Sequence, residues 1–564
     1  MTDSLYPKVR AWIDDDPDPR TAAELTSLLT SAEAGDEGAA AELADRFSGL
    51  LQFGTAGLRG ALGGGPARMN RAVVARAAAG LAAFLTESIG GAGATVAIGF
   101  DARYGSREFA EDSARIIAGA GGQVHLFDQH CPTPVLAYAV RALGADAGVM
   151  VTASHNPPED NGYKVYLGGR VVTGDGQGAQ LVAPMDEQIA AKIAAVDTVT
   201  DLPRSEDFSR LGDELIERYV DSVLTLAGTN PLPGLKIVYT PMHGVGGEIL
   251  TRVLTGAGFT DLTAVHEQAS PDPDFPTVPF PNPEEAGALD LAYATAERVG
   301  ADLIIANDPD ADRVSIAVPA GDGWRQLTGD EAGALLGEQI ARGYADSSGA
   351  AFANSIVSSR LLGAIAAHYG IAHYETLTGF KWISRAPGLT YGYEEAIGYC
   401  VHPEAVRDKD GLSAALMLAL LTAEANAAGR SLADLLDDLA LRHGLYATGA
   451  LSARVADLAA IPAAMARLRA HPPRELAGSP VVETADLSTP TAELPATDAL
   501  VYTTAANDRV IVRPSGTEPK VKCYLEVIID VDDREELPAA KRSAADRLAA
   551  LKADIAAAAG LPAP

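Results

Sequence analysis

Short apolar runs that end in glycine, proline or aspartate recur along this chain, and they constrain its fold more than any other feature. Helical patterns separate most of the runs, which cover residues 95–100, 147–151, 235–239, 302–306 and 352–357. The first clear helix is predicted to begin after Asn70, which can cap it, and to stop at Gly90 and Gly91. Apolar runs that alternate with helices are typical of βαβ units with buried strands. We therefore predict three similar α/β units.

The two ends of the chain differ from this pattern. The first fifty residues are acidic and rich in alanine, with helical runs near 22–29 and 39–47, and the aspartates at 14–16 are interpreted as a solvated face. After about residue 440 prolines become frequent, two strands follow near 499–502 and 521–529, and an alanine-rich helix closes the chain. From composition and strand spacing we predict domains at 1–205, 206–325, 326–440 and 441–564.

Length and charge narrow the class of protein. A chain of 564 residues exceeds what one hydrophobic core supports. Its 44 Lys and Arg against 75 Asp and Glu give a net charge of −31, which disfavours nucleic acid as a partner. The sequence shows neither an apolar stretch near the ~20 residues of a membrane span nor a secretory signal, and its three cysteines are dispersed. We expect a cytoplasmic protein without membrane contact, and the sequence does not indicate its oligomeric state.

The most informative motif is Thr152-Ala153-Ser154-His155-Asn156-Pro157, which follows the apolar run 147–151. It places a serine hydroxyl beside a histidine in a turn. Loops at the carboxyl ends of parallel strands are where α/β sheets bind ligands. The alternative is that Ser154 and Asn156 only cap a helix or shape a turn.

A second motif, Asp308-Pro309-Asp310-Ala311-Asp312-Arg313, follows the apolar run 302–306. Carboxylates at alternate positions of an extended loop would point the same way, and hard divalent cations prefer oxygen ligands. Mg²⁺ is favoured over Ca²⁺, since the loop has no EF-hand pattern and phosphate chemistry lies elsewhere in the chain. A solvated acidic turn is the alternative.

Two further motifs suit a sugar phosphate. Residues 513–520 read Arg-Pro-Ser-Gly-Thr-Glu-Pro-Lys, and a guanidinium, hydroxyls and backbone amides near glycine can surround a phosphate, although an ordinary β-turn remains the alternative. Residues 391–399 hold adjacent glutamates among glycines and tyrosines, which can accept hydrogen bonds from sugar hydroxyls or form a surface feature. Lys381 in the nearby 376–382 turn, and the cations of 54–60 and 161–164, are weaker candidates.

Together these motifs resemble the α-D-phosphohexomutase superfamily, in particular its long phosphoglucomutase, phosphomannomutase and phosphopentomutase branch. The resemblance runs from about residue 50 almost to the end of the chain, and the motifs occur in family order. It implies three tandem mixed-sheet α/β domains and a C-terminal α+β domain around a central cleft. It also implies a mutase that interconverts sugar 1-phosphates and 6-phosphates through a phosphoserine and a bisphosphate intermediate, with Mg²⁺ as cofactor and a sugar bisphosphate such as glucose 1,6-bisphosphate as activator.

The resemblance also implies a role for each matching residue. Ser154 would carry the phosphate and, with Asp308, Asp310 and Asp312, bind the metal. The groups that assist proton transfer and charge neutralisation would be His155, Lys164 and Arg59. The residues that would bind the sugar phosphate are Arg313, Thr378, Gly379, Lys381, Glu394, Ala396, Arg513, Ser515, Gly516, Thr517 and Lys520.

One position departs from the hexose-specific pattern. Many hexose mutases carry serine two residues after the first sugar-loop glutamate, where this chain has Ala396. A hydroxyl contact is lost, so the choice between hexose and pentose phosphates, or a bisphosphate synthase activity, stays open. Two other readings compete with a mutase: a phosphatase with Asp308 as nucleophile, and a sugar-phosphate sensor without turnover.

Overall fold

The computed structural model describes residues 2–54, 57–228, 234–321, 323–344, 349–454, 459–491, 494–514 and 520–562. The chain forms two compact units. The first comprises Met1–Leu327, Leu389–Tyr391 and Ala396–Ala423, and the second comprises Thr328–Gly388, Gly392–Glu395 and Glu424–Pro564.

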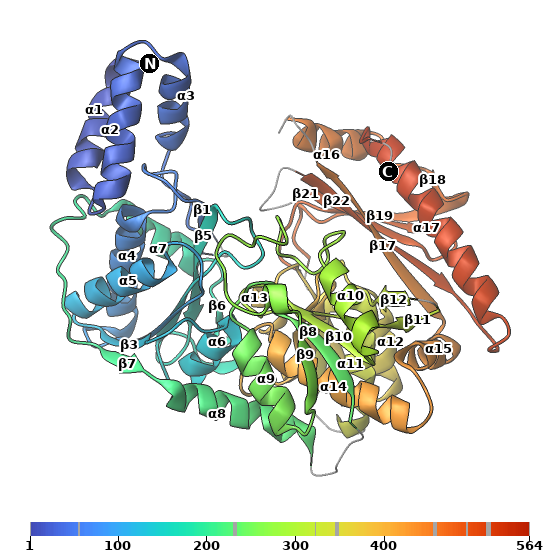
Figure 1. Cartoon of the computed structure of the whole chain (residues 1–564). Coiled ribbons are helices and arrows are strands. Elements are labelled where there is room, and N and C mark those ends of the chain that lie inside the picture. Colours follow the sequence, from blue (N-terminus) through green and yellow to red (C-terminus); the bar gives the residue numbers. More distant parts are fainter. Residues whose placement is uncertain are drawn as a thin grey trace. The chain divides into compact units, whose positions relative to one another are not determined.

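Three helices at the start of the first unit form a small helical layer (Figure 1): α1 (Thr2–Asp15), α2 (Pro19–Glu33) and α3 (Glu37–Arg46). The helical runs predicted near 22–29 and 39–47 are confirmed as α2 and α3. Asp18 and Asp36 cap these helices by accepting hydrogen bonds from backbone N–H groups of their first turns. Val9, Leu25 and Leu43 form a separate apolar core among the three helices.

The interpretation of the aspartates at 14–16 as a solvated face fits Asp14, which is exposed, but it is wrong for Asp15. Asp15 accepts backbone hydrogen bonds from Val199 at 2.8 Å and Thr200 at 3.0 Å, and it pairs with Arg76 at 3.1 Å. The sequence pattern could not show this, because the partners lie 61 to 185 positions away in the chain.

The first α/β domain contains a mixed sheet with the strand order β1-β5-β4-β2-β3-β7, and β6 pairs with β5. Strands β2, β3, β4 and β7 are parallel to one another, whereas β5 runs antiparallel to β1, β4 and β6. The elements are β1 (Leu58–Ala61), α4 (Arg71–Ile89), β2 (Thr95–Phe100), α5 (Ser106–Gly119), β3 (Gln123–Phe127), α6 (Thr133–Ala142), β4 (Ala147–Val151), β5 (Asp160–Leu167), η1 (Gly174–Gly176), β6 (Ala179–Gln180), α7 (Met185–Ala194) and β7 (Ser209–Leu211).

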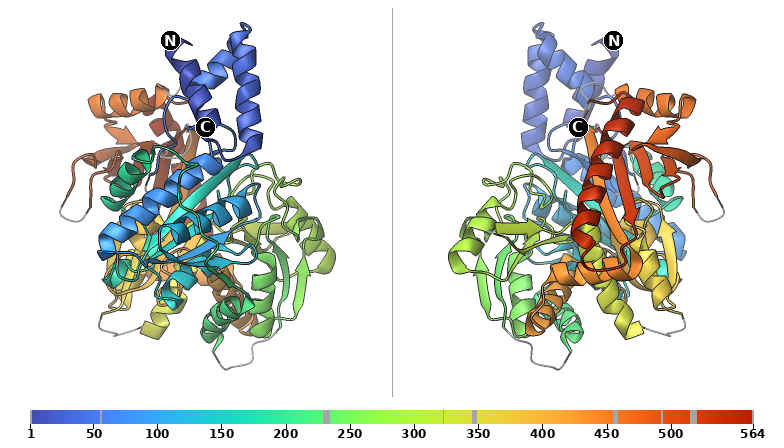
Figure 2. Two further views of the ribbon diagram at one scale, coloured as in Figure 1. Left: turned by 90° about the vertical axis from the view of Figure 1, so that its left-hand side faces the viewer. Right: turned by 90° about the vertical axis from the view of Figure 1, so that its right-hand side faces the viewer.

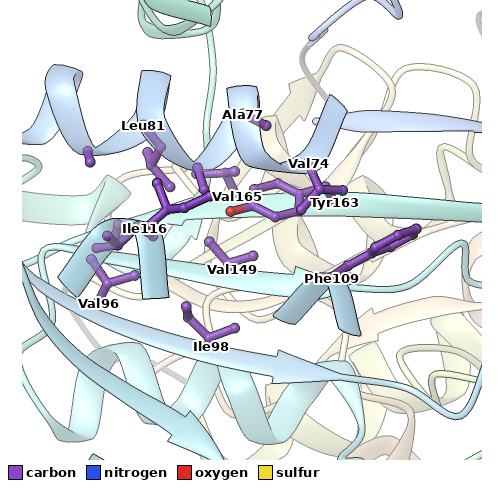
Figure 3. Close-up of a cluster of buried hydrophobic side chains, with 14 of the residues drawn as sticks. Val74, Ala77, Leu81, Val96, Ile98, Phe109, Ile116, Val149, Tyr163 and Val165 are labelled. Carbon is purple, nitrogen blue, oxygen red and sulfur yellow. The ribbon is translucent and has the colours of Figure 1, made fainter. Parts of the chain in front are cut away.

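Helices α4 and α5 cover one face of this sheet and bury its main apolar core (Figure 3). Asn70 caps α4 by accepting a hydrogen bond from Val73 N at 2.9 Å, and Gly90 ends it in the left-handed conformation, so both predicted ends are confirmed. Helix α6 lies on the other face, where a Cβ on Gly148 of β4 would meet Val140 at 2.3 Å. The glycine therefore lets helix and sheet approach closely.

The second α/β domain also contains a mixed sheet, with the order β12-β11-β10-β8-β9. Strands β8, β9 and β10 are parallel and β11 and β12 are antiparallel additions. The elements are α8 (Asp213–Leu224), η2 (Thr225–Ala227), β8 (Lys236–Thr240), α9 (Gly247–Gly256), β9 (Asp261–Ala264), η3 (His266–Gln268), α10 (Asp290–Val299), β10 (Leu303–Asn307), β11 (Val314–Ala320) and β12 (Gly323–Gln326).

The third region contributes to both units. Its parallel pair β13 and β14 lies in the second unit. The elements of this region are α11 (Gly329–Tyr344), β13 (Ala351–Ser355), α12 (Leu361–His368), β14 (Ala372–Thr376), α13 (Phe380–Ile383), β15 (Leu389–Glu394), β16 (Gly398–Cys400), α14 (Gly411–Ala427) and α15 (Leu432–His443).

The C-terminal domain is an antiparallel sheet with the order β17-β22-β21-β20-β19-β18, and its apolar core lies against two helices. The elements are β17 (Leu445–Arg454), α16 (Ala460–Ala470), β18 (Glu475–Leu476), β19 (Ser479–Asp486), β20 (Leu500–Thr504), β21 (Arg509–Pro514), β22 (Lys520–Ile529) and α17 (Leu537–Ala559). The predicted strands along the chain are thus confirmed within one or two residues. The predicted domain boundaries and the central cleft stay predictions.

One expectation about apolar stretches needs correction. By length and composition α4 is apolar enough to cross a membrane, and α14 and α15 pass the same test as a pair bent by 90°. This is weak evidence for a span, since 61% of the α4 window is buried and α4 supplies much of the core of the first α/β domain.

We predict that Gly80→Ala destabilises the first α/β domain. A Cβ on Gly80 would lie 2.5 Å from Ile193 Cγ1 and 2.8 Å from Ile193 N, so helices α4 and α7 would have to separate. We expect the free energy of unfolding to fall by about 1–3 kcal/mol, although alanine is the better helix former. Urea denaturation measures this free energy of unfolding. Gly91→Ala at the end of the same helix, where no atom of the described residues lies within 4 Å, should change it little; equal effects would contradict the packing argument.

Candidate active site

Ser154 lies in a strained turn directly after β4. Its backbone φ is 52°, in the left-handed region that serine seldom adopts. Its N–H donates to Thr152 Oγ1 at 2.9 Å, and Arg103 fixes the loop by donating to the carbonyl oxygens of Ser154 at 2.6 Å and Asn156 at 2.5 Å. These hydrogen bonds therefore hold the Ser154 backbone in a conformation that it would not keep in a free chain. They place its side chain at the carboxyl end of the sheet.

The Ser154 hydroxyl lies among charged groups of the second domain. It donates to Asp308 Oδ2 at 2.8 Å and accepts a hydrogen bond from Arg313 Nη1 at 2.9 Å. His155 Nδ1 is 3.3 Å from the same oxygen. The predicted neighbourhood of Ser154, His155, Asp308 and Arg313 is thus present within the first unit.

Asp308, Asp310 and Asp312 converge as the sequence suggested, but for a different reason. The loop is a tight turn rather than an extended segment, because Ala311 has φ 55° and its N–H donates to Asp308 O at 2.9 Å. One carboxylate oxygen from each aspartate lies within 4.8 Å of the other two, and all three side chains are fully buried. The prediction of an extended loop is wrong, since alternate spacing cannot reveal a residue in the left-handed conformation.

Lysines surround the aspartates. Lys164 Nζ donates to Asp310 Oδ2 at 2.7 Å and Asp312 Oδ2 at 2.8 Å, and Lys409 Nζ lies 3.3 Å from Asp312. Burial opposes the charge on Lys164, but the two carboxylates outweigh it and raise the pKa of its ammonium. Burial likewise opposes ionisation of Asp310, yet Lys164 holds the pKa of that carboxyl below its usual range. We conclude that this part of the site is a buried ion cluster.

The remaining groups differ in charge. Burial, followed by repulsion from Asp310 and Asp312, raises the pKa of Asp308 well above its usual value. Burial, followed by the positive charges of Arg313 and Arg59, lowers the pKa of His155 well below its usual value. His155 is therefore neutral near pH 7 and can accept a proton. Arg59 reaches the serine loop by donating from Nη1 to Asn156 Oδ1 at 3.1 Å.

The alternation of β5 explains why Lys164 faces the site. Tyr163 and Val165 point into the apolar core under α4, as Figure 3 shows, so Lys164 and Tyr166 between and beside them face the opposite side. The same rule applies to β1, where Leu58 enters the core and Arg59 points away from it. One strand thus supplies both core residues and a candidate catalytic cation.

Three residues of this site were missing from the sequence prediction. Besides Arg103 and Lys409, Thr133 at the start of α6 donates from its hydroxyl to Asp310 Oδ2 at 2.7 Å. Lys409 belongs to Asp408-Lys409-Asp410-Gly411, and this pattern at the start of α14 is a signal that could have revealed it. Gly411 is required there, because a Cβ would lie 2.3 Å from Arg313 O.

The aspartate cluster fits a divalent cation. Asp310 Oδ1 is buried and has no hydrogen-bond partner among the described residues, which is costly for a carboxylate oxygen unless a further group binds it. Three carboxylates with oxygen donors are the ligands that Mg²⁺ or Ca²⁺ accepts. The residues present can therefore hold a hard metal ion.

The predicted sugar-loop residues divide between the two units. In the second unit, Glu394 is 9% exposed, and Glu395 accepts hydrogen bonds at 3.1 Å from the hydroxyls of Ser355 and Ser358. Glu395 therefore supports the loop, and burial raises its pKa. In the first unit, Ala396 O accepts from Arg313 Nε at 3.1 Å, so its backbone contributes to the active site even though its side chain has no hydroxyl.

Other predicted substrate-binding residues lie in the second unit. Thr378 and Gly379 precede α13, where Lys381 Nζ lies 5.6 Å from the centroid of the Trp382 ring. Arg513 lies on β21 and Lys520 begins β22. Ser515, Gly516 and Thr517 lie outside the described residues. The binding roles of these residues stay predictions.

Comparisons with known proteins agree with this architecture. Four family models match in order: phosphoglucomutase/phosphomannomutase α/β/α domain I at residues 50–200, domain II at 217–321, domain III at 328–442 and the C-terminal domain at 452–543. A solved phosphoglucomutase from Paramecium has a TM-score of 0.69 at 19% identity, covering 92% of this chain and 97% of its own. A phosphoglucomutase/phosphomannomutase family protein from Burkholderia thailandensis scores 0.64 at 21% identity, covering 87% and 98%.

Curated relatives are closer in sequence. A protein named probable phosphomannomutase from Haemophilus influenzae is 46% identical over 461 residues, covering 81% of this chain and 93% of its own. A protein named probable phosphoribomutase from Schizosaccharomyces pombe is 34% identical, covering 93% and 94%, and a phosphoglucomutase from Staphylococcus epidermidis is 35% identical, covering 85% and 91%.

The four-domain fold and the buried serine–aspartate site define an isomerase of the phosphosugar mutase class. The chain belongs to the phosphoglucomutase/phosphomannomutase family within the α-D-phosphohexomutase superfamily. The predicted fold class and enzyme class are confirmed, and a phosphatase or a sensor is disfavoured.

We predict that Thr133→Val weakens divalent metal binding about 10- to 100-fold, because the buried hydroxyl orients Asp310. Isothermal titration calorimetry with Mn²⁺ measures the metal affinity. Thr251→Val is the matched control, since that hydroxyl donates to the carbonyl of Gly247 in its own helix. Metal affinity equal to that of the wild type in Thr133→Val would contradict the orienting role.

Proposed function

We propose that this enzyme interconverts sugar 1-phosphates and 6-phosphates, or pentose 1- and 5-phosphates, with Ser154 as the phosphoryl carrier. The observation that carries the proposal is the Ser154 hydroxyl between Asp308 at 2.8 Å and Arg313 at 2.9 Å, in a strained turn above three buried aspartates. Phosphoryl transfer needs positioning and charge neutralisation more than covalent chemistry, and this site supplies both.

The first half-reaction moves a phosphoryl group from phosphorylated Ser154 to a free hydroxyl of the sugar phosphate. The bond from phosphorus to Oγ breaks, a bond from phosphorus to the sugar oxygen forms, and the proton of the sugar hydroxyl passes through a base to the departing Ser154 oxygen, which becomes a hydroxyl again. Neutral His155, 3.3 Å from Oγ, is our candidate for that base, whereas Lys164 is held charged by Asp310 and Asp312 and neutralises charge. Arg313 stabilises the phosphoryl oxygens through its guanidinium.

The second half-reaction is the reverse step in a new orientation. The bound sugar bisphosphate turns and returns its other phosphoryl group to Ser154. A sugar bisphosphate such as glucose 1,6-bisphosphate would therefore also phosphorylate, and so activate, an enzyme whose serine is free. The phosphate that does not react is assigned to Arg513, Lys520 and the intervening loop, and the sugar hydroxyls to Glu394, Lys381 and Thr378.

Asp308, Asp310 and Asp312 are proposed to hold Mg²⁺ together with the phosphoserine. When bound, the ion supplies positive charge that offsets the phosphoryl oxygens. We further propose a cytoplasmic location, with small-molecule sugar phosphates and neither nucleic acid nor membrane as partners, in keeping with the net charge of −31.

We predict that Ser154→Ala lowers mutase turnover at least 1,000-fold, on the order of the loss when a catalytic nucleophile is removed. Intact-protein mass spectrometry should find one phosphate on the wild type after incubation with glucose 1,6-bisphosphate and none on the variant. Ser88→Ala is the control, because the Ser88 hydroxyl donates to Phe84 O within its own helix. If the protein were instead a phosphatase acting through Asp308, the Ser154→Ala variant would keep its activity and release inorganic phosphate. That result would overturn the proposal.

A pentose phosphate is the second candidate substrate. Two observations favour it: relatives named phosphoribomutase and phosphopentomutase match 93% of this chain, and position 396 has no hydroxyl. The backbone oxygen of Ala396 accepts a hydrogen bond from Arg313 Nε, but its methyl side chain has no group that could form a hydrogen bond to a hexose.

We expect ribose 1-phosphate to be turned over with a kcat/KM at least equal to that of glucose 1-phosphate. Ala396→Ser should raise the ratio of glucose to ribose kcat/KM by roughly 2- to 10-fold, the value of one added hydrogen bond. Parallel assays of the 1-phosphates of glucose, mannose, N-acetylglucosamine, ribose and deoxyribose measure these kcat/KM values. Ala396→Gly controls for side-chain volume; a ratio unmoved by serine would exclude position 396 from specificity.

A further inference from the structure

Residues 2–49 precede the first matching family domain, which begins at residue 50, so the family relationship gives helices α1–α3 no role. Both views in Figure 2 show these helices next to the first α/β domain of the same unit. Their own apolar core makes them a small packed layer rather than a loose tail. The contacts of that layer with the domain indicate what it does.

One set of contacts attaches the helical layer to the domain. At the end of α1, Asp15 binds the backbone of Val199 and Thr200 and pairs with Arg76 of α4. The Arg76 guanidinium also lies 5.3 Å from the centroid of the Trp12 ring, and Trp12 packs against the domain core. Hydrogen bonds, an ion pair and apolar packing together fix α1 to α4.

A second set of contacts holds the loop 62–69, which follows β1. Arg46 of α3 donates from Nη1 to Gly64 O at 3.2 Å, and its own carbonyl accepts from Ala67 N at 3.0 Å. Glu24 of α2 accepts from Gly64 N at 2.9 Å and from Arg46 Nη1 at 2.7 Å. Both backbone polar groups of Gly64 are thereby bound by the helical layer.

The glycines of this loop allow the close approach. A Cβ on Gly64 would lie 2.7 Å from Leu25 Cγ and 2.9 Å from Thr21 O, and Gly65, with φ 109°, lies against Arg46. On the domain side, the Asn70 amide donates to Gly63 O at 2.9 Å and Gly65 O at 2.8 Å. The loop is therefore held between α2 and α3 on one side and the start of α4 on the other.

Strand β1, which carries Arg59, depends on this loop. It has four residues and lies at the edge of the sheet, where β5 is its pairing partner. A short edge strand has few hydrogen bonds to keep it in place and needs support at its ends. Arg59 must keep its reach to Asn156 in the serine loop, a contact of 3.1 Å.

We propose that Arg46 and Glu24 are positioning residues for Arg59: the helical layer fixes loop 62–69 and thereby the edge strand that aims the Arg59 guanidinium at the serine loop. This inference rests on the proposed mutase function for its catalytic readout. The effect on turnover follows because small displacements of a catalytic group cost much of its contribution.

The test is a double-mutant cycle with sugar 1-phosphate turnover primed by glucose 1,6-bisphosphate. Arg46→Ala should lower kcat about 10-fold with little change in KM. In an Arg59→Lys background, the same substitution should lower kcat less than about twofold, because the two changes act through one group. Arg10→Ala is the matched control: Arg10 pairs with Glu33 inside the helical layer, away from the loop.

Amide hydrogen exchange of residues 58–69 gives a second readout that needs no activity. Exchange should be faster in Arg46→Ala and Glu24→Ala than in the wild type, and unchanged in Arg10→Ala. Unchanged exchange in Arg46→Ala and Glu24→Ala would overturn the inference. An equal loss of kcat from Arg46→Ala in the wild type and in the Arg59→Lys background would also overturn it, and would indicate general destabilisation. A wild type that lacks mutase turnover would instead refute the proposed function, while the exchange experiment would still decide whether the layer orders β1.

Discussion

The site depends on one balance of buried charge. Three aspartates lie together without exposure to solvent, and their mutual repulsion is offset by Lys164, Lys409 and Arg313. Isolated charges of one sign cannot be buried at acceptable cost, so the aspartates require these partners or a metal ion. Under the proposed function, the same cations would neutralise a phosphoryl group. One set of residues would then serve both the stability of the folded site and the binding of phosphate.

Different segments of the first unit contribute to this balance, and each has a local reason for its position. A left-handed residue turns the aspartate loop back on itself, and another places the serine above its strand. Thr133 and Arg103 bind backbone and side-chain groups of these two loops from neighbouring elements. Because both loops lie in one compact unit, their geometry follows from the packing of the first two domains.

Much of the fold and the centre of the site could be predicted from the sequence. Buried parallel strands are continuous apolar runs, which is why β2 and β4 were located to the residue. Ser154 and the aspartates were recognisable because polar residues directly follow such runs. Arg103 and Thr133 were not, since their partners lie far away in sequence, whereas the sequence pattern around Lys409 offered a signal that was missed. The shape of the aspartate loop depends on the φ of Ala311, which composition does not reveal. The same distance in sequence hid the partners of Asp15.

Strand β5 has a consequence for how this enzyme tolerates change. Alternate residues serve the apolar core and the ion cluster, so a slip of one position relative to β4 would bring Tyr163 against the aspartates and drive an ammonium group into the hydrocarbon interior. A slip of one position therefore disrupts both surfaces together. Insertions or deletions within 160–167 should thus disrupt folding and chemistry at the same moment.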